Sequence, residues 1–517
     1  MANQPNHENA EHITSFEQTF SVDKLLDVAI IGAGFSAICL AIQLRKSGIN
    51  NFAIFEKTDS LGGTWHDNTY PGAACDVPSH LYSYSFEMRH NWSKRFSEQS
   101  EILKYLNECA TKYLVRRHIF FDTEIIEARF QEDKGVWQIF TSSGKSYCTK
   151  ILVSGMGQLN IPNTPAIPGL AQFQGKQFHS ARWNHEIDLR GKKVAIVGTG
   201  ASAIQFVPEV AKQAGELTVF QRSANWIVPK PDRVYSAREI WVYENFPLVQ
   251  KLYRTLIYLQ MEISHPLLHQ GNRLGKLAEK FARWNIQRQI KDPNVAAKLT
   301  PDYPVGCRRI LISNDYYPTF NLPHVSLVTD NITRIEADRI ITNNGAEYEA
   351  EVIIFGTGFK STEFLTPVEF VGKSAQKLND YWQTGAEAYL GMTVSEFPNF
   401  FMMYGPNTNL GHNSIIFMFE CQVRYIVQAV EKLINEKLTS IEVRQEVMDN
   451  YNHNIQRDLT ETVWAADCHS WYKNDSGKIT NNWPHTTIDY WLKTRQPNWT
   501  EFILQSASTK QETVGSA

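Results

Sequence analysis

The stretch "DVAIIGAGFSA", residues 27–37, decides the fold predicted for this chain. A short apolar strand runs directly into Gly32-Ala-Gly34, and a helix-like segment follows. In this setting the first glycine makes a tight turn and the second lets the backbone approach a pyrophosphate. Ala37 supplies the small residue that helix–strand packing needs, and the helix N-terminus offers free N–H groups to phosphate. The stretch therefore predicts a βαβ dinucleotide-binding unit.

A second turn of the same kind lies far downstream, in "VAIVGTGASAIQ", residues 194–205. It carries Gly198-Thr199-Gly200-Ala201-Ser202-Ala203 between an apolar strand and another helix-like segment. A single glycine motif is weak evidence, but two in the strand–turn–helix context indicate an internal duplication of the nucleotide-binding unit. The sequence therefore predicts an α/β fold with two Rossmann-like domains.

The residues that end the next strand differ in charge between the two units. Glu56 follows Gly34 by 22 residues, whereas Arg222, followed by Ser223, comes 22 residues after Gly200. A carboxylate suits a ribose diol, and a guanidinium suits a 2′-phosphate. We therefore expect FAD at the first turn and NADPH at the second. One alternative is that one turn is a relic without a ligand.

The predicted domain organisation is interleaved. The sequence assigns residues 25–160 and 386–505 to the FAD domain and residues 161–229 and 330–385 to the NADP domain. Long stretches with helical periodicity predict a helical insert over residues 230–329. The polar ends, residues 1–24 and 506–517, are predicted to be flexible tails.

Composition excludes several classes of function. The chain has 517 residues with a net charge of -3, which does not indicate nucleic acid or an anionic membrane as a partner. Seven cysteines without a CxxC pair make a disulfide framework or a redox dithiol improbable, and no metal site is predicted. The start lacks the apolar core of a secretory signal, and the stretch "FPLVQKLYRTLIYLQMEI" predicts an amphipathic helix rather than a membrane span. We expect a cytoplasmic protein.

Two dinucleotides in one chain imply hydride transfer from NADPH to a flavin. The electrons must then move on, and the chain has neither the CxxC of a disulfide reductase nor haem or Fe–S spacing. Molecular oxygen remains as the acceptor. Monooxygenase chemistry is therefore the leading interpretation.

Two further motifs carry a family resemblance. The stretch "FQGKQFHSARWN", residues 173–184, has Phe173-x-Gly175-xxx-His179-xxx-Trp183, and "GGTWHDNTYPGAACD" spans residues 62–76. Together they resemble the signatures of type I Baeyer–Villiger monooxygenases, over nearly the whole chain. Asn184 departs from the Pro or Asp that is usual in this family. The segments around "GCRR" and "NLGHNS" look closer to the aryl-ketone (4-hydroxyacetophenone monooxygenase-like) branch than to the small cyclic-ketone branch.

The resemblance implies a mechanism and a set of residues. In "YPVGCRRILISNDYY", Arg309 corresponds to the arginine that stabilises an anionic C4a-peroxyflavin and the ketone adduct, with Asp76 as its partner. Arg308, commonly Lys in the family, corresponds to a residue at the 2′-phosphate of NADP. Phe173, Gly175, His179 and Trp183 would couple the two domains, although simple packing is the alternative. The cofactor residues expected beside both turns are Phe35, Ser36, Glu56, Thr64, Trp65, Asp67, Asp76, Tyr82, Ile125, Arg222, Ser223 and Arg308.

The expected reaction inserts one oxygen atom beside a ketone carbonyl and gives an ester or lactone, with sulfoxidation as a side activity. One alternative is a flavin monooxygenase that oxidises nitrogen or sulfur. Another is an uncoupled NADPH oxidase or a flavin sensor without a substrate. A monomer or a small homo-oligomer is expected.

Overall fold

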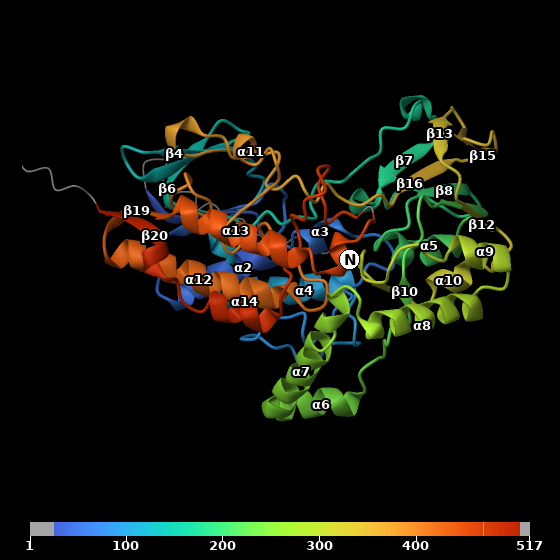
Figure 1. Cartoon of the computed structure of the whole chain (residues 1–517), viewed down its shortest axis with the longest axis horizontal. Helices are drawn as coiled ribbons and strands as arrows, with labels where there is room; N and C mark the ends of the chain where they lie inside the picture. Colours follow the sequence, from blue (N-terminus) through green and yellow to red (C-terminus); the bar gives the residue numbers. More distant parts are fainter. Residues whose placement is uncertain (1–24, 469, 507–517) are drawn as a thin grey trace, which may run out of the picture.

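The computed structural model describes residues 25–468 and 470–506. The tails predicted over residues 1–24 and 506–517 therefore lie outside the described part, apart from Ser506 at the end of the last strand. Two nucleotide-binding units lie side by side along the long axis of the molecule (Figure 1).

The first unit is built on an eight-stranded sheet with the order β17-β4-β5-β6-β1-β2-β3, and β18 pairs with β6. Strand β1 (Leu26–Ile31) runs parallel to both β2 (Phe52–Phe55) and β6 (Ser146–Ser154). These strands are rich in Val, Ile and Phe because parallel strands are covered on both faces. Helix α2 (Phe35–Lys46) follows the first glycine turn and packs against α12 (Ile415–Asn435).

The other elements of this unit cover or extend the sheet. They are α3 (Thr64–Asp67), α4 (Gln99–Lys112), η1 (Arg116–His118), β3 (Ile119–Phe120), β4 (Ile125–Gln131), β5 (Val136–Thr141), β17 (Glu369–Val371), η5 (Lys373–Ala375), α11 (Leu378–Tyr381) and β18 (Phe400–Met402).

The second unit has a five-stranded sheet, β12-β9-β8-β16-β7, in which all pairs are parallel. Strand β8 (Lys193–Val197) enters the second glycine turn, and α5 (Ala203–Ala211) leaves it. The remaining elements are η2 (Leu170–Gln172), β7 (Lys176–His179), η3 (Ser180–Arg182), β9 (Glu216–Phe220), β12 (Val325–Val328), β16 (Val352–Phe355) and the antiparallel strands β13 (Ile332–Ile335), β14 (Arg339–Thr342) and β15 (Glu347–Glu349).

A helical segment leaves the second unit after β9. It contains α6 (Ala237–Asn245), α7 (Pro247–Glu262), η4 (His265–Leu268), α8 (Arg273–Gln289), α9 (Pro293–Lys298) and α10 (Tyr316–Thr319), with the short parallel pair β10 (Ile227–Val228) and β11 (Leu311–Ile312). Helix α7 confirms the amphipathic helix predicted from the sequence. Helices α6 and α7 project from the body of the molecule (Figure 1).

The C-terminal part returns to the first unit. After α12 come β19 (Leu438–Val443), α13 (Gln445–Leu459), η6 (Val463–Ala465), α14 (Thr487–Lys493), η7 (Trp499–Glu501) and β20 (Phe502–Ser506), and β19 and β20 form an antiparallel pair. Among residues 25–468 and 470–506, none of the helices combines the length and apolar character needed to cross a bilayer.

The points at which the chain passes between units differ from the predicted ranges. The sequence assigns residues 330–385 to the NADP domain, whereas β17 pairs with β4 of the first sheet. It also assigns residues 230–329 to the insert, whereas β12 pairs with β9 of the second sheet. Both strands join their sheets through long-range pairing, which local periodicity does not encode.

Candidate active site

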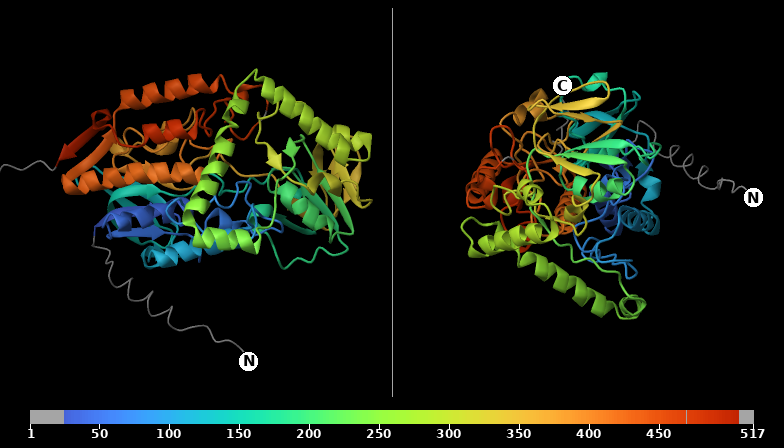
Figure 2. Two further views of the ribbon diagram at one scale, coloured as in Figure 1. Left: turned by 90° about the horizontal axis from the view of Figure 1, so that it is seen from below. Right: turned by 90° about the vertical axis from the view of Figure 1, so that its right-hand side faces the viewer.

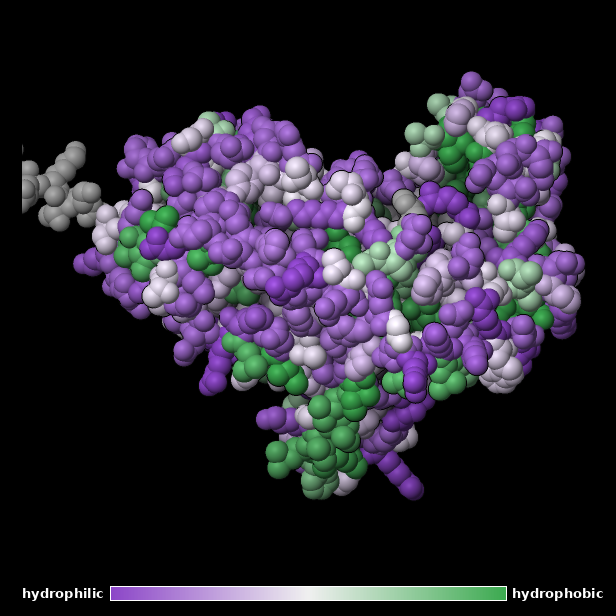
Figure 3. All heavy atoms as spheres, in the orientation of Figure 1, coloured by the Kyte–Doolittle hydropathy of each residue, from purple (hydrophilic) through white to green (hydrophobic). Residues whose placement is uncertain are grey.

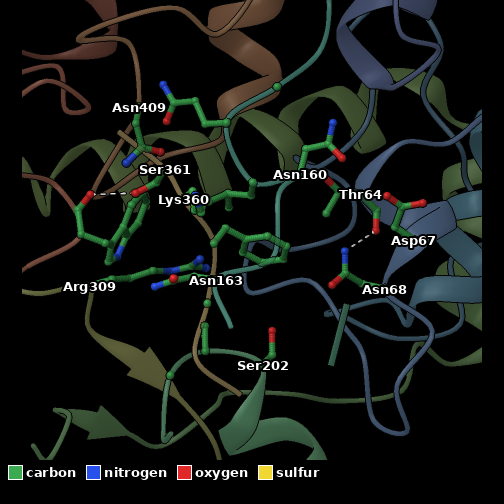
Figure 4. Close-up of a pocket in the computed structure, with 18 of the residues that line it drawn as sticks. Thr64, Asp67, Asn68, Asn160, Asn163, Ser202, Arg309, Lys360, Ser361 and Asn409 are labelled. Atoms are coloured by element: carbon green, nitrogen blue, oxygen red, sulfur yellow. Dashed lines mark hydrogen bonds between the residues drawn. The ribbon is translucent and has the colours of Figure 1, made fainter. Parts of the chain in front are cut away.

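A cavity of about 1500 Å³ is lined by residues of both nucleotide units (Figure 4). Gly32 and Gly155 line it at the ends of β1 and β6, and Gly198 and Gly356 at the ends of β8 and β16. Open parallel sheets bind ligands at the carboxyl ends of their strands. The cavity therefore lies where this fold places its cofactors.

The first glycine turn requires glycine for steric reasons. Gly32 has φ +91°, and a Cβ there would lie 2.9 Å from the carbonyl oxygen of Gly155. A Cβ on Gly63 would lie 3.1 Å from the Cα of Gly34, so two backbone turns approach each other beside the cavity. The N-terminus of α2 follows directly. This cradle fits the pyrophosphate of a dinucleotide such as FAD.

Glu56 is held at the base of this turn. Its carboxylate accepts hydrogen bonds from the backbone N–H of Ala33 (2.7 Å) and from the backbone N–H (3.0 Å) and hydroxyl (2.9 Å) of Thr58. The residue is buried and lines the cavity. It is therefore fixed as an acceptor where a ribose would lie.

The second turn also requires glycine for steric reasons, and positively charged side chains lie beside it. Gly198 has φ +103°, and a Cβ there would lie 2.5 Å from the carbonyl oxygen of Gly356. Arg308 Nη1 donates to Ser223 Oγ (2.5 Å), next to Arg222, and both arginines line the cavity. Arg308 Nε is buried and has no hydrogen-bond partner within the described part of the chain. This arrangement fits a phosphate group.

Arg309 and Asp76 form an ion pair in the cavity wall, with 2.8 Å between Nη2 and Oδ2. The Asp76 side chain is 12% exposed, and that of Arg309 is 40% exposed, so the guanidinium remains open to the cavity. Burial is the largest single influence and opposes the charge of Arg309, but Asp76, together with the nearby Tyr472, Cys75 and Tyr404, raises the pKa of the guanidinium above its ordinary value. Figure 4 shows Arg309 reaching into the pocket. The site thus holds a permanent, oriented cation.

The profile of the family described as flavin-binding monooxygenase-like matches residues 26–384. The chain belongs to this family. It is 42% identical to a Baeyer–Villiger monooxygenase of Pseudomonas aeruginosa, over 95% of this chain and 94% of the relative. A Baeyer–Villiger monooxygenase of Streptomyces coelicolor is 40% identical, with 92% of each chain covered.

Solved structures agree with this assignment. Cyclohexanone monooxygenase from Rhodococcus sp. Phi1 bound to NADP+ matches with a TM-score of 0.85 and 27% identity, over 94% of this chain and 100% of that one. OTEMO in complex with FAD and NADP matches with a TM-score of 0.84 and 28% identity, over 93% and 99% of the two chains. The α/β fold and the monooxygenase class predicted from the sequence are confirmed, and the protein is a flavin monooxygenase.

Most of the predicted site residues come together around this same cavity. Those that line it are Gly32, Gly34, Phe35, Ser36, Glu56, Thr64, Trp65, Asp67, Asp76, Tyr82, Ile125, Gly198, Thr199, Gly200, Ala201, Ser202, Arg222, Ser223, Arg308 and Arg309. Ala203 is instead buried behind the turn, and a Cβ on Gly356 would lie 3.0 Å from its Cβ. Its small side chain serves helix–strand packing.

The Phe173–Trp183 motif does not line the cavity. His179 ends β7, its Nδ1 accepts from the Ala181 N–H (3.1 Å), and burial lowers its pKa, which keeps the ring neutral. Trp183 packs against Phe206 of α5, with ring centroids 5.4 Å apart. Phe173 is buried in a separate cluster, and its ring fills the space that a side chain at Gly175 would need. The motif thus packs within the second unit.

The residues just beside this motif reach the first unit. Arg182 Nη1 lies 3.2 Å from Asp67 Oδ2, and Thr69 Oγ1 is hydrogen-bonded to His185 Nε2 (2.9 Å). Asp67 lines the cavity beside Thr64 and Trp65. These contacts are a physical route by which the motif could orient the two units, and this role remains a prediction.

Gln205 also lines the cavity, but no sequence motif predicts a role for it. This residue of α5 donates from Nε2 to Asp76 Oδ1 (3.4 Å) and to the Ala74 carbonyl (3.0 Å), and it accepts from the Tyr70 hydroxyl (3.0 Å). It comes directly after the second glycine turn, but its partners are 129–135 residues away in sequence. Only the packing of the two units brings them together.

Within the described residues the structure contains one disulfide, Cys307–Cys468, although the sequence indicated no disulfide framework. The two cysteines are 161 residues apart, so no local spacing reveals the pair. Cys307 directly precedes the two cavity arginines, and the segment after Cys468 lines the cavity through Trp471 and Tyr472. The bond therefore ties two walls of the site.

Proposed function

We propose that the protein is an NADPH-consuming Baeyer–Villiger monooxygenase that inserts one oxygen atom beside a ketone carbonyl and forms an ester or lactone. The carrying observation is the Arg309–Asp76 pair, placed in one cavity with both glycine turns. FAD, reduced by NADPH, supplies the activation of molecular oxygen for this reaction.

The roles of the chain's own residues follow from their positions. Arg309 donates hydrogen bonds to the negative charge that develops on the carbonyl oxygen when an oxygen atom adds to the ketone. Asp76 keeps the guanidinium oriented and compensates its burial. The first turn and Glu56 would hold FAD, and the second turn, with Arg222, Ser223 and Arg308, would hold NADPH through its 2′-phosphate.

Two finer expectations belong to the same proposal. We place the protein in the cytoplasm, as a monomer or a small homo-oligomer. The substrate is expected among aryl ketones, because the segments around "GCRR" and "NLGHNS" resemble that branch. Asn409, Leu410 and His412 of the second segment line the cavity, which supports a role in substrate selection.

Purification followed by product analysis tests the proposal. The purified protein should be yellow and should oxidise NADPH much faster than NADH. A panel of aryl, cyclic and linear ketones should give esters or lactones by mass spectrometry, with one product per NADPH consumed. Amine N-oxides as the main products would identify the heteroatom-oxidising alternative. Release of hydrogen peroxide with every ketone would identify an uncoupled oxidase.

A further inference from the structure

The outward face of α7 is apolar. Leu248, Leu252, Leu256 and Leu259, with Ile263 at the C-cap, follow one another at intervals of three or four residues and therefore form one stripe. Their exposed fractions lie between 46% and 81%. Gln250 and Ile257, on the opposite side of the helix, are buried against the body. The helix is thus apolar on the side that nothing in the described chain covers.

Helix α8 carries a second stripe of the same kind. Leu274, Leu277, Phe281 and Trp284 are 46–64% exposed. Both helices lie on the underside of the molecule (Figure 2). The apolar surface of the projecting helices α6 and α7 is visible in Figure 3. Monomeric proteins rarely expose apolar patches of this extent without a partner. We call the exposed apolar residues of α7 and α8 the ridge.

Positive charge surrounds the ridge. Residues 237–289 contain eight basic and four acidic residues, a local charge of +4 in a chain whose net charge is -3. Six of the basic residues are exposed, namely Arg238, Lys251, Arg273, Lys276, Lys280 and Arg288. Of the four acidic residues, Glu244 is exposed, with 57% of its side chain accessible, and the other three are partly buried. The net charge of the whole chain conceals this local excess.

We propose that the ridge docks on a membrane surface that contains anionic phospholipid. Helices with Leu, Phe and Trp on one face and Lys or Arg beside it lie in the plane of the lipid interface, without crossing the bilayer. Anionic headgroups attract the flanking basic residues, and the acyl boundary accepts the apolar ones. A symmetric dimer through the ridge would instead bring two positive patches together, which opposes association.

Flotation of the full-length, FAD-loaded protein with vesicles tests the proposal. The protein should float with vesicles of phosphatidylcholine containing about 30% phosphatidylglycerol and much less with phosphatidylcholine alone. About 0.5 M NaCl should weaken the binding because it screens the basic residues. Lys276→Gln/Lys280→Gln should lower the preference for the anionic vesicles.

Leu252→Gln/Leu256→Gln should weaken vesicle binding by at least about tenfold, since it removes apolar area from the lipid contact. Leu277→Gln/Phe281→Gln tests the second stripe independently. The matched control is Ile488→Gln/Leu492→Gln on α14, where two residues four apart are 47% and 58% exposed outside the ridge. The control should bind vesicles as the parent does. FAD content and NADPH oxidation without vesicles should be the same in all variants.

Three results would overturn the proposal. The first is that the parent protein fails to float with the anionic vesicles. The second is an equal loss of binding in the α14 control. The third is a dimer in sedimentation velocity that Leu252→Gln/Leu256→Gln dissociates, which would assign the ridge to a second copy of the chain.

Discussion

Gln205 and Asp76 belong to different nucleotide units, yet Gln205 Nε2 donates a hydrogen bond to Asp76 Oδ1 across 3.4 Å. The other carboxylate oxygen of Asp76 accepts from Arg309 at 2.8 Å. The orientation of the Arg309–Asp76 pair therefore depends on α5, the helix that follows the second glycine turn. Gln205 is a positioning residue that links the NADP unit to the cation of the proposed reaction.

Gln205→Leu should lower ester formation by roughly tenfold or more, because small misplacements of reacting groups have large effects on rate. FAD should stay bound, and a larger share of the electrons from NADPH should reduce oxygen to hydrogen peroxide and not form ester. The measurement compares NADPH consumption, peroxide and ester yield. Gln213→Leu, at an exposed position just after the same helix, is the control. If Gln205→Leu and Gln213→Leu form the same amount of ester per NADPH consumed, Gln205 does not position the ion pair.

Arg309→Ala should abolish ester formation, with a loss of at least about 10²–10³ in rate, since one oriented donor to developing negative charge is removed. FAD should remain bound and reducible by NADPH, because the glycine turns are untouched. Arg309→Lys keeps the charge but loses the planar fork, so we expect intermediate activity. Stopped-flow kinetics measure the reduction of FAD by NADPH, and product analysis measures ester formation, so the two steps are followed separately. Ester formation that persists in Arg309→Ala contradicts the assignment.

Arg222→Gln and Arg308→Gln should each raise the KM for NADPH by about tenfold or more while changing the KM for NADH little. Charge-assisted hydrogen bonds to a phosphate are strong, and NADH lacks the 2′-phosphate. Steady-state kinetics with both nucleotides provide the measurement. The control is Arg190→Gln, an exposed arginine of the same unit that pairs with Asp188. If the KM for NADPH and the KM for NADH rise by the same factor, the two arginines do not bind the 2′-phosphate.

The parts of the site that were predictable from the sequence are those that follow strands directly. The turns at Gly32 and Gly198 are set by local sterics, and a family resemblance extended the prediction to Arg309 and Asp76. Gln205 and the Cys307–Cys468 bond depend instead on contacts between distant segments. The same limit applies to β17, whose pairing with β4 no local period encodes. The excess of basic residues around the ridge could not be predicted from the net charge of the chain, because that number sums the charges of all residues wherever they lie.

The Cys307–Cys468 bond should stabilise the site region. It closes a loop of 161 residues, and disulfides typically contribute about 2–4 kcal/mol by restricting the unfolded chain. Cys468→Ser, or reduction of the parent protein with dithiothreitol, should therefore lower the melting temperature. Dithiothreitol should not change the melting temperature of Cys468→Ser any further. Cys148→Ser, at a free and partly exposed cysteine, is the control. An unchanged melting temperature in reduced parent protein would show that the bond carries no stability.

His80 should make the fold sensitive to mild acid. It is buried among the rings of Tyr235, Tyr243 and Tyr253, at centroid distances of 5.1, 4.8 and 5.4 Å. Burial, with the nearby charge of Arg254, lowers its pKa from 6.5 to about 4. Between these two pH values the unfolded chain binds a proton that the folded chain does not. The free energy of unfolding should therefore fall as the pH falls from 6.5 to 4, by about 3 kcal/mol from this residue.

His80→Leu should reduce this acid sensitivity. Its melting temperature should fall less between pH 7.5 and pH 4.5 than that of the parent, whatever its absolute stability at pH 7.5, since the variant has no imidazole to protonate on unfolding. His453→Leu, at an exposed position, should keep the parent's dependence on pH. Melting followed by FAD fluorescence over this range provides the measurement. If His80→Leu and the parent lose stability in parallel, the acid sensitivity originates from other buried groups, because the proton uptake of His80 on unfolding is then negligible.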